Sequence, residues 1–289
     1  MIARAEIWLG TLVEIALPEA DASETRFAAA FAAIAHIHRK MNAHDLASDL
    51  ARITRAAHMR TIVVDAQTYA VLELALALAR DTDGAFDPTV AKAAISDDSA
   101  PPPIAAPAAG EFASLVILEG DNHVRTTAPI ALDLGGIAKG YAVDRAIAAL
   151  IDSGAGGGVV NAGGDLRAFG SAGWVPVRVR HPANAALAAH LFDVCNVAVA
   201  TSADYFRADG VLHDPRTGSR RTFGASVTVV APTCALADAL TKVVANDSAR
   251  AAETLARHGA HAFRLEPCDD SVRATTTCAA STSQLRLAA

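Results

Sequence analysis

A carboxylate and an ammonium stand beside bare backbone in the segment DLGGIAKGYAVD, which begins at Asp133. Gly135 and Gly136 let the backbone come close to a ligand. Lys139 lies at the start of a helical pattern, where free N–H groups and the helix dipole favour anions. The segment matches neither common nucleotide-binding motif. It predicts an anion site, but a tight strand-to-helix turn with a surface ion pair fits the spacing equally well.

Two more glycine-bearing loops carry polar side chains directly after a regular element. The segments are DTDGAFDPTV and VNAGGDLRAFG, and their candidate residues are Asp83, Gly84, Asp87, Thr89, Asn161, Gly163, Gly164 and Asp165. Any one of these loops is more often only a turn. Three of them together predict that the loops meet at one cleft.

The segment TSADYFRADGVLHDPRTG adds the best candidates for acid and base chemistry. His213 is the histidine that falls inside such a loop, and Asp214 follows it directly. Either side chain is of a type that accepts a proton from a nucleophile. The alternative is structural, because DPRTG is itself a good turn sequence.

The segment APTCALADALTKVV predicts a helix with oxygen and nitrogen groups on one face. Asp238, Thr241 and Lys242 follow the i, i+3, i+4 spacing of neighbours on a helix. Oxygens of an aspartate and a threonine suit a hard cation. The alternative is an ordinary Asp–Lys pair, which contributes only about 0.3–0.5 kcal/mol on an exposed helix.

The composition excludes several classes of protein. The chain has 289 residues and a formal charge of −6, with scattered Lys and Arg, so we expect no nucleic-acid partner. No apolar run approaches the roughly 20 residues that cross a bilayer, so we expect no stable membrane insertion. The four cysteines form no CxxC pair that would indicate zinc. The first residues alternate without the apolar core of a signal peptide, and we expect a cytoplasmic protein.

The elements that must position these residues indicate an α+β fold, because strands outnumber helices and follow one another in neighbouring runs. We treat residues 1–289 as a single domain with a Pro/Ala-rich connector at about 97–110. Strands are predicted over 6–17, 113–118, 123–127, 130–133, 174–182, 225–232 and 261–265, and the segment 156–170 predicts a short buried strand that ends in a glycine turn. Helices are predicted after a Ser23 cap, over 66–80, up to Gly154, and over 234–245 and 248–258.

The motifs TDGAFDPTV, DLGGIAKGYAVDRA, VNAGGDLRAFG, VATSADYF, DPRTG and SVTVVAPTCALADAL occur in an order and spacing that resemble the ApbE family, the FAD:protein FMN transferases. The resemblance covers most of the chain. It implies transfer of FMN from FAD to a threonine of an acceptor protein, with release of AMP and dependence on Mg²⁺. It also implies an acceptor with a site of the Ser/Thr-Gly-Ala-Ser/Thr type. The implied fold is a duplicated T-fold with antiparallel sheets, helices on one side and an FAD groove between the halves.

The resemblance also assigns roles to individual residues. It implies FAD contacts at Ala85, Phe86, Asp87, Asp133, Lys139 and His213. It implies magnesium ligands at Gly136, through its backbone carbonyl, and at Asp238 and Thr241. His213 and Asp214 become the candidates for the base that deprotonates the acceptor threonine.

The chain departs from the family pattern at two of these places. Lys242 stands where the family usually has a threonine, and a protonated lysine has no lone pair for a metal. Val211 stands where the family usually has a histidine. Two alternatives to the transferase therefore stay open: an FAD pyrophosphatase that yields FMN and AMP, and a flavin-binding protein with impaired catalysis.

Overall fold

The structure is a computed structural model that describes most of the 289 residues. The described residues are 1–89, 111–182, 184–203, 212–213, 215, 220–221, 224–268, 271–277 and 284–287. The predicted connector at 97–110 lies outside them, as do Asp214 and the side chain of His213.

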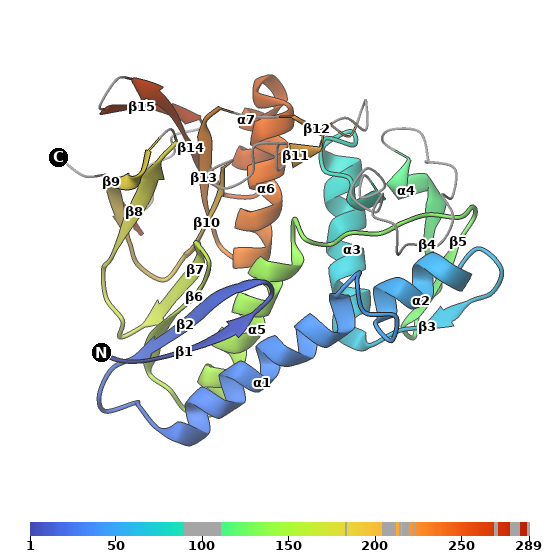
Figure 1. Ribbon diagram of the computed structural model, residues 1–289, viewed down its shortest axis with the longest axis horizontal. Coiled ribbons are helices and arrows are strands. Elements are labelled where there is room, and N and C mark those ends of the chain that lie inside the picture. Colours follow the sequence, from blue (N-terminus) through green and yellow to red (C-terminus); the bar gives the residue numbers. More distant parts are fainter. Residues whose placement is uncertain are drawn as a thin grey trace.

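An antiparallel sheet of eight strands forms the centre of the described part of the chain (Figure 1). In spatial order the strands are β1 (Ile2–Trp8), β2 (Thr11–Leu17), β6 (Gly157–Ala162), β7 (Asp165–Gly170), β10 (Ala198–Ala203), β13 (Ser226–Ala231), β14 (His261–Cys268) and β15 (Ser271–Thr277). Every neighbouring pair runs antiparallel. The predicted α+β class is confirmed.

Three helices, α1 (Glu24–Met41), α5 (Ala138–Asp152) and α6 (Cys234–Asn246), lie on one side of this sheet (Figure 1). Ser23 caps α1, because its hydroxyl accepts a hydrogen bond from the Arg26 N–H at 3.3 Å. Gly154, with φ of 81°, lets the chain leave α5 while the Ala155 N–H donates back to the Leu150 carbonyl. α7 (Ser248–Arg257) follows α6. No helix of the described residues is long and apolar enough to span a membrane.

The opposite face of the sheet packs against a smaller sheet of β8 (Val175–His181), β9 (Asn184–Val194) and β16 (Leu285–Leu287). The side chains of β13 alternate between the two faces of the eight-stranded sheet, and both faces are buried. Val227 and Val229 belong to the core beneath the helices, whereas Val230 joins the core beneath the small sheet.

A second group of elements lies beside the helices, at the far end of α1 (Figure 1). It contains α2 (Asp49–Ala56), α3 (Ala66–Asp81), α4 (Phe112–Leu115) and a sheet of β3 (Ile62–Val63), β5 (His123–Thr126) and β4 (Val116–Leu118). β11 (Leu212–His213) pairs with β12 (Arg220–Arg221). The duplicated T-fold that the resemblance implies stays a prediction.

The predicted single strand over 6–17 is wrong. The chain turns at Leu9 and Gly10, whose φ angles are 55° and 72°, and β1 and β2 form a hairpin. The prediction over 113–118 is wrong in its first half, which is the short helix α4. Residues 130–133 form no strand either; the Asp133 N–H donates to the Pro88 carbonyl instead of joining a ladder.

Candidate functional site

The site forms where the first turn of α5 meets α6. Gly140 makes this approach possible, because a Cβ at this position would overlap the backbone carbonyl of Cys234. With no side chain between them, the two helices come together near their N-termini, and Lys139 on α5 reaches Asp238 on α6.

Asp144, one turn further along α5, fixes the start of α6. Its carboxylate accepts hydrogen bonds from the N–H groups of Cys234 at 3.0 Å and Ala235 at 2.9 Å, and it pairs with Arg167 on β7 at 2.6 Å. These N–H groups have no partner inside α6. The carboxylate therefore locks α5, α6 and β7 in one arrangement.

Two strands direct polar side chains toward the helices. Along β10, Ala198 and Ala200 pack into the core beneath the helices, so Ser202 lies on the same face. Asp165 is the first residue of β7 and lies on the same face of the strand as Arg167, which contacts α5. Both side chains consequently reach the α5–α6 crossing.

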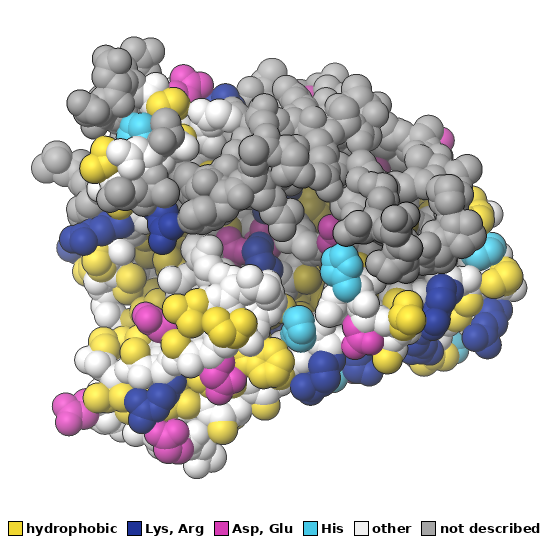
Figure 2. Space-filling model, in the orientation of Figure 1, with side chains coloured by type: hydrophobic (Ala, Val, Ile, Leu, Met, Phe, Trp, Pro, Cys, Tyr) yellow, Lys and Arg dark blue, Asp and Glu magenta, His cyan; other side chains and the backbone are white. Residues whose placement is uncertain are grey.

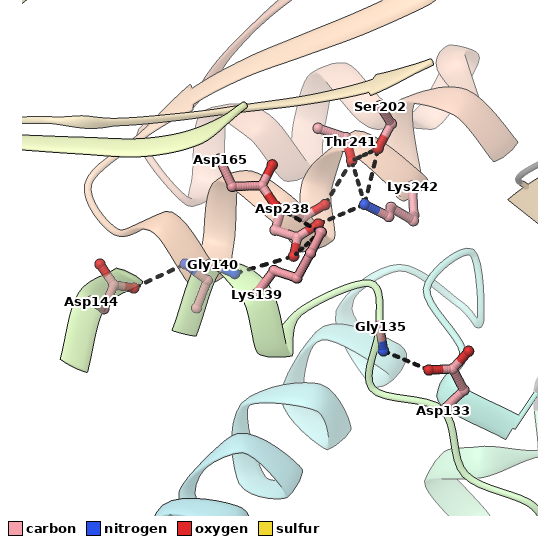
Figure 3. Close-up of polar contacts among 11 residues, drawn as sticks. Asp133, Gly135, Lys139, Gly140, Asp144, Asp165, Ser202, Asp238, Thr241 and Lys242 are labelled. Atoms are coloured by element: carbon pink, nitrogen blue, oxygen red, sulfur yellow. Dashed lines mark hydrogen bonds and ion pairs between the residues drawn. The ribbon is translucent and has the colours of Figure 1, made fainter. Parts of the chain in front are cut away.

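Two aspartates and two lysines meet there in one cluster (Figure 3). Lys139 Nζ lies 2.6 Å from Asp165 Oδ2 and 3.2 Å from Asp238 Oδ2, and Lys242 Nζ lies 2.6 Å from Asp238 Oδ1. The side chain of Asp238 is fully buried and that of Asp165 nearly so, while the lysines keep 31% and 22% of their side chains exposed. The cluster, hereafter the Asp–Lys cluster, sums to zero charge with all four groups ionised.

Hydroxyl groups complete the surroundings of Lys242. Its ammonium donates to Ser202 Oγ at 2.9 Å and to Thr241 Oγ1 at 3.1 Å. The Thr241 hydroxyl donates to the Asp238 carbonyl at 2.7 Å, so the 2.7 Å contact between Ser202 and Thr241 has Ser202 as its donor. Both hydroxyl oxygens therefore act as acceptors toward the ammonium.

The charges shift one another's pKa values. Burial raises the pKa of Asp238, but Lys139 and Lys242 outweigh burial and hold it below its ordinary value. Burial lowers the pKa of Lys139, but Asp165 and Asp238 outweigh burial and raise it. Burial and the charge of Asp238 raise the pKa of Asp165. Asp238 is thus the carboxylate that both ammonium groups keep ionised.

The turn at Gly135 and Gly136, hereafter the glycine turn, lies against the side chain of Lys242. A Cβ at Gly136 would lie 3.4 Å from Lys242 Cε and 3.6 Å from the Phe86 ring, so the bare turn, the lysine stem and the ring are neighbours. Asn246 of α6 donates to the Ala85 carbonyl at 3.1 Å and ties the TDGAFD loop to the same helix. The loops that contain Gly136 and Phe86 thus lie together, and Asp165 of the third loop pairs with Lys139; the common cleft stays a prediction.

Asp87 contributes a buried oxygen to this region. Its Oδ1 accepts from the Thr89 N–H at 2.7 Å and from the Thr89 hydroxyl at 2.5 Å. Its Oδ2 is buried with no hydrogen-bond partner among the described residues. A buried acceptor of this kind needs a partner, which a ligand donor or a water molecule would supply.

Asp133 does not join the Asp–Lys cluster. Its exposed carboxylate accepts from the Gly135 N–H at 2.7 Å and shapes the turn, and it lies apart from the cluster (Figure 3). The predicted roles of His213 and Asp214 rest on side chains outside the described residues. In Figure 2, acidic and basic side chains meet in a hollow near the middle of the face shown.

The side chains present do not fit the predicted magnesium site. The oxygens of Asp238 and Thr241 that would bind the metal already accept from the Lys242 ammonium. Within the described part of the chain, no group of three or more His, Cys, Asp or Glu side chains gathers where a metal ion could be held.

Three contributors to the site carried no assigned role in the sequence analysis. Asp165 was expected only as part of a glycine loop, and Ser202 and Asp144 only as members of motifs. Ser202 lies on the same face of β10 as Ala198 and Ala200, so its position can be predicted once that face is known to be buried. Asp144 has no local signal, because it caps a helix 90 residues away.

Comparisons with known proteins identify the fold and the family. The model of the ApbE family matches residues 9–264. The ApbE protein of Thermotoga maritima is 27% identical, with a TM-score of 0.80 and 96% of each chain covered. The flavin transferase ApbE of Vibrio cholerae is 22% identical, with a TM-score of 0.78 and 96% of each chain covered.

The flavinyl transferase ApbE of Pseudomonas stutzeri, in its apo form, is also 22% identical; its TM-score is 0.77, with 96% of this chain and 94% of that chain covered. A comparison with curated proteins gives no match. Because the family model spans most of the 289 residues and the fold agrees with these structures, the chain belongs to the ApbE family.

Proposed function

We propose that this protein transfers FMN from FAD to a threonine of an acceptor protein and releases AMP. The observation that carries the proposal is the pair of ammonium groups on Asp238, beside the glycine turn, in a chain of the ApbE family. Two of the similar solved structures are flavin transferases, which supports the same reaction here.

The reaction exchanges one phosphorus–oxygen bond for another. The acceptor hydroxyl oxygen attacks the FMN-side phosphorus, and the anhydride bond to the AMP-side phosphate breaks. AMP leaves with the bridging oxygen, and the hydroxyl proton passes to a base, for which His213 and Asp214 stay the predicted candidates. The partly exposed ammonium groups of Lys139 and Lys242 supply positive charge for the phosphate oxygens and the departing AMP.

The buried carboxylates of Asp165 and Asp238 fix the positions of the two ammonium groups. The ammonium groups are held by buried carboxylates, so they need little reorganisation when charge moves toward the leaving phosphate. Gly136 places bare backbone against the Lys242 stem, so the stem packs closely on the turn and the ammonium is held near it. The buried Oδ2 of Asp87, which has no hydrogen-bond partner among the described residues, supports the predicted contact of Asp87 with FAD.

The test is a transfer assay with the full chain. Purified protein is incubated with FAD and an acceptor domain that carries a Ser/Thr-Gly-Ala-Ser/Thr site, in buffer containing Mg²⁺. Intact-mass spectrometry should show one FMN group added to the acceptor, and chromatography should show an equal amount of AMP. An acceptor of unchanged mass, with FAD bound by the enzyme, contradicts the proposal.

Two controls separate the alternatives. If FMN and AMP form at the same rate without acceptor, the protein is an FAD pyrophosphatase, in which water takes the place of the hydroxyl. If FAD binds and no AMP forms with or without acceptor, the protein binds flavin without turning it over. Replacing the acceptor threonine by alanine in a matched domain should abolish the mass gain.

A further inference from the structure

The ammonium of Lys242 has a complete set of partners. It offers three donors, and three oxygens accept them: Asp238 Oδ1 at 2.6 Å, Ser202 Oγ at 2.9 Å and Thr241 Oγ1 at 3.1 Å. One acceptor is a buried carboxylate and two are hydroxyls. The set resembles a small cation site that a side chain of the protein itself fills.

The same oxygens are the ones a divalent cation would need. Mg²⁺ binds oxygen at about 2.0–2.1 Å in a strict octahedron and prefers carboxylates. Asp238 has no free side for it, because Oδ1 faces Lys242 and Oδ2 accepts from Lys139 and from the Gly140 N–H. A metal at this carboxylate would meet two ammonium groups at close range, and like charges repel.

The lysine is also held in place along its stem. Lys242 follows Asp238 by one helical turn, so the helix itself directs the ammonium to the carboxylate. On its other side the stem faces the Gly136 turn, where a Cβ would lie 3.4 Å from Cε and 3.6 Å from Cγ. The cation is therefore a fixed part of the site.

We infer that the Lys242 ammonium replaces the divalent cation at the phosphate site, so that this chain binds FAD and acts on it without Mg²⁺. The inference concerns the phosphate site that the proposed transferase uses. It assigns Lys242 as the positive charge beside the phosphates, which acts through its charge because its three donors already have acceptors, with Ser202 and Thr241 as positioning residues that orient its ammonium.

Metal and FAD binding test the inference without any need for turnover. Mn²⁺ binding is followed by electron paramagnetic resonance, with and without FAD, in the wild type, Lys242→Thr and Lys242→Met. We expect no saturable Mn²⁺ site in the wild type or in Lys242→Met. Lys242→Thr adds an oxygen where the ammonium was, and we expect it to gain one site.

The affinity for FAD provides a second readout. In the wild type, the FAD dissociation constant should be equal in Mg²⁺ and in EDTA. In Lys242→Thr, Mg²⁺ should tighten FAD binding by a factor in the range of about 5–150, the usual size of coupling between two ligands. Lys40→Thr, on α1, removes a lysine charge elsewhere and should behave as the wild type does.

A saturable Mn²⁺ site in the wild type, or wild-type FAD binding that strengthens with Mg²⁺, would overturn the inference. Failure of a folded Lys242→Thr protein to gain a metal site would also overturn it, because Lys242 would then not be what excludes the metal. The wild-type measurements decide the matter even if a variant does not fold. If wild-type FMN transfer requires Mg²⁺, the inference fails and the proposed function stands. If transfer fails and the binding data hold, the proposed function fails, and Lys242 still replaces the divalent cation in FAD binding.

Discussion

The substitution Asp238→Asn probes the Asp–Lys cluster most sharply. The amide keeps the size of the side chain, but it removes the negative charge that faces Lys139 at 3.2 Å and Lys242 at 2.6 Å. Both carboxylate oxygens of Asp238 accept hydrogen bonds, from Lys242 on one side and from Lys139 and the Gly140 N–H on the other. The NH₂ group of asparagine can only donate, so it faces another donor on whichever side it takes. The variant therefore leaves two ammonium groups without their shared carboxylate.

The expected cost follows from the burial of this carboxylate. Removing one partner of a buried ion pair lowers the free energy of unfolding by about 3–5 kcal/mol. At the roughly 2 °C per kcal/mol typical of larger domains, the melting temperature should fall by about 6–10 °C. Urea unfolding followed by circular dichroism measures the free energy, and a thermal scan measures the shift.

Two comparison variants make the result specific. Glu24→Gln breaks the exposed pair with Arg4 and should cost about 1 kcal/mol or less. Adding Lys242→Met to Asp238→Asn removes one of the unpaired cations, so the double variant should be more stable than the single one. A loss of unfolding free energy below about 1 kcal/mol for Asp238→Asn would refute the reasoning, because a loss that small is typical of an exposed ion pair.

Three further predictions concern Gly140, Asp87 and the pH dependence of Asp238. Gly140→Ala should lower the free energy of unfolding by about 1–3 kcal/mol or more, because its Cβ overlaps the Cys234 carbonyl, whereas Gly156→Ala meets only a flexible side chain at 3.4 Å; urea unfolding compares them. Asp87→Asn should weaken FAD binding by about tenfold, measured by titration calorimetry, if its Oδ2, which has no partner among the described residues, contacts the ligand; an unchanged affinity removes Asp87 from the binding site. Because the folded pKa of Asp238 is held below its ordinary value of 3.8, its stabilising effect is present above that value and is lost as the pH falls through the lower folded pKa. The stability difference between the wild type and Asp238→Asn should therefore shrink below about pH 4, and a difference that stays constant with pH would contradict this origin.

The sequence predicted the local parts of the site well. The spacing of Asp238, Thr241 and Lys242 placed them on one helix face, and their contacts confirm it. The Ser23 cap and Gly154 marked helix ends, because capping chemistry is local. The motifs also led to the ApbE family, which the family model confirms.

The parts that depend on packing between distant segments could not be predicted. The contact between Gly140 and Cys234 joins residues nearly a hundred positions apart, and the sequence of neither segment predicts it. Lys139 was expected either to contact an anion such as FAD or to form a surface ion pair, and neither prediction named Asp165 and Asp238, which share its ammonium. The hairpin turn at Leu9 and Gly10 was missed because alternation continues across it.

The same limit explains the magnesium prediction. The resemblance supplied ligand positions, and the sequence alone showed a lysine in place of a threonine. Only the structure shows that the Lys242 ammonium lies on the oxygens of Asp238, Ser202 and Thr241. A substitution beside a ligand position thus changes the chemistry of the whole set.

The most direct test of the account is the mass of an acceptor domain after incubation with the wild-type protein and FAD, once in EDTA and once in Mg²⁺. The account predicts the addition of one FMN group at equal rates in both buffers, with AMP released in equal amount. An acceptor that gains FMN only in Mg²⁺, or in neither buffer, would contradict it.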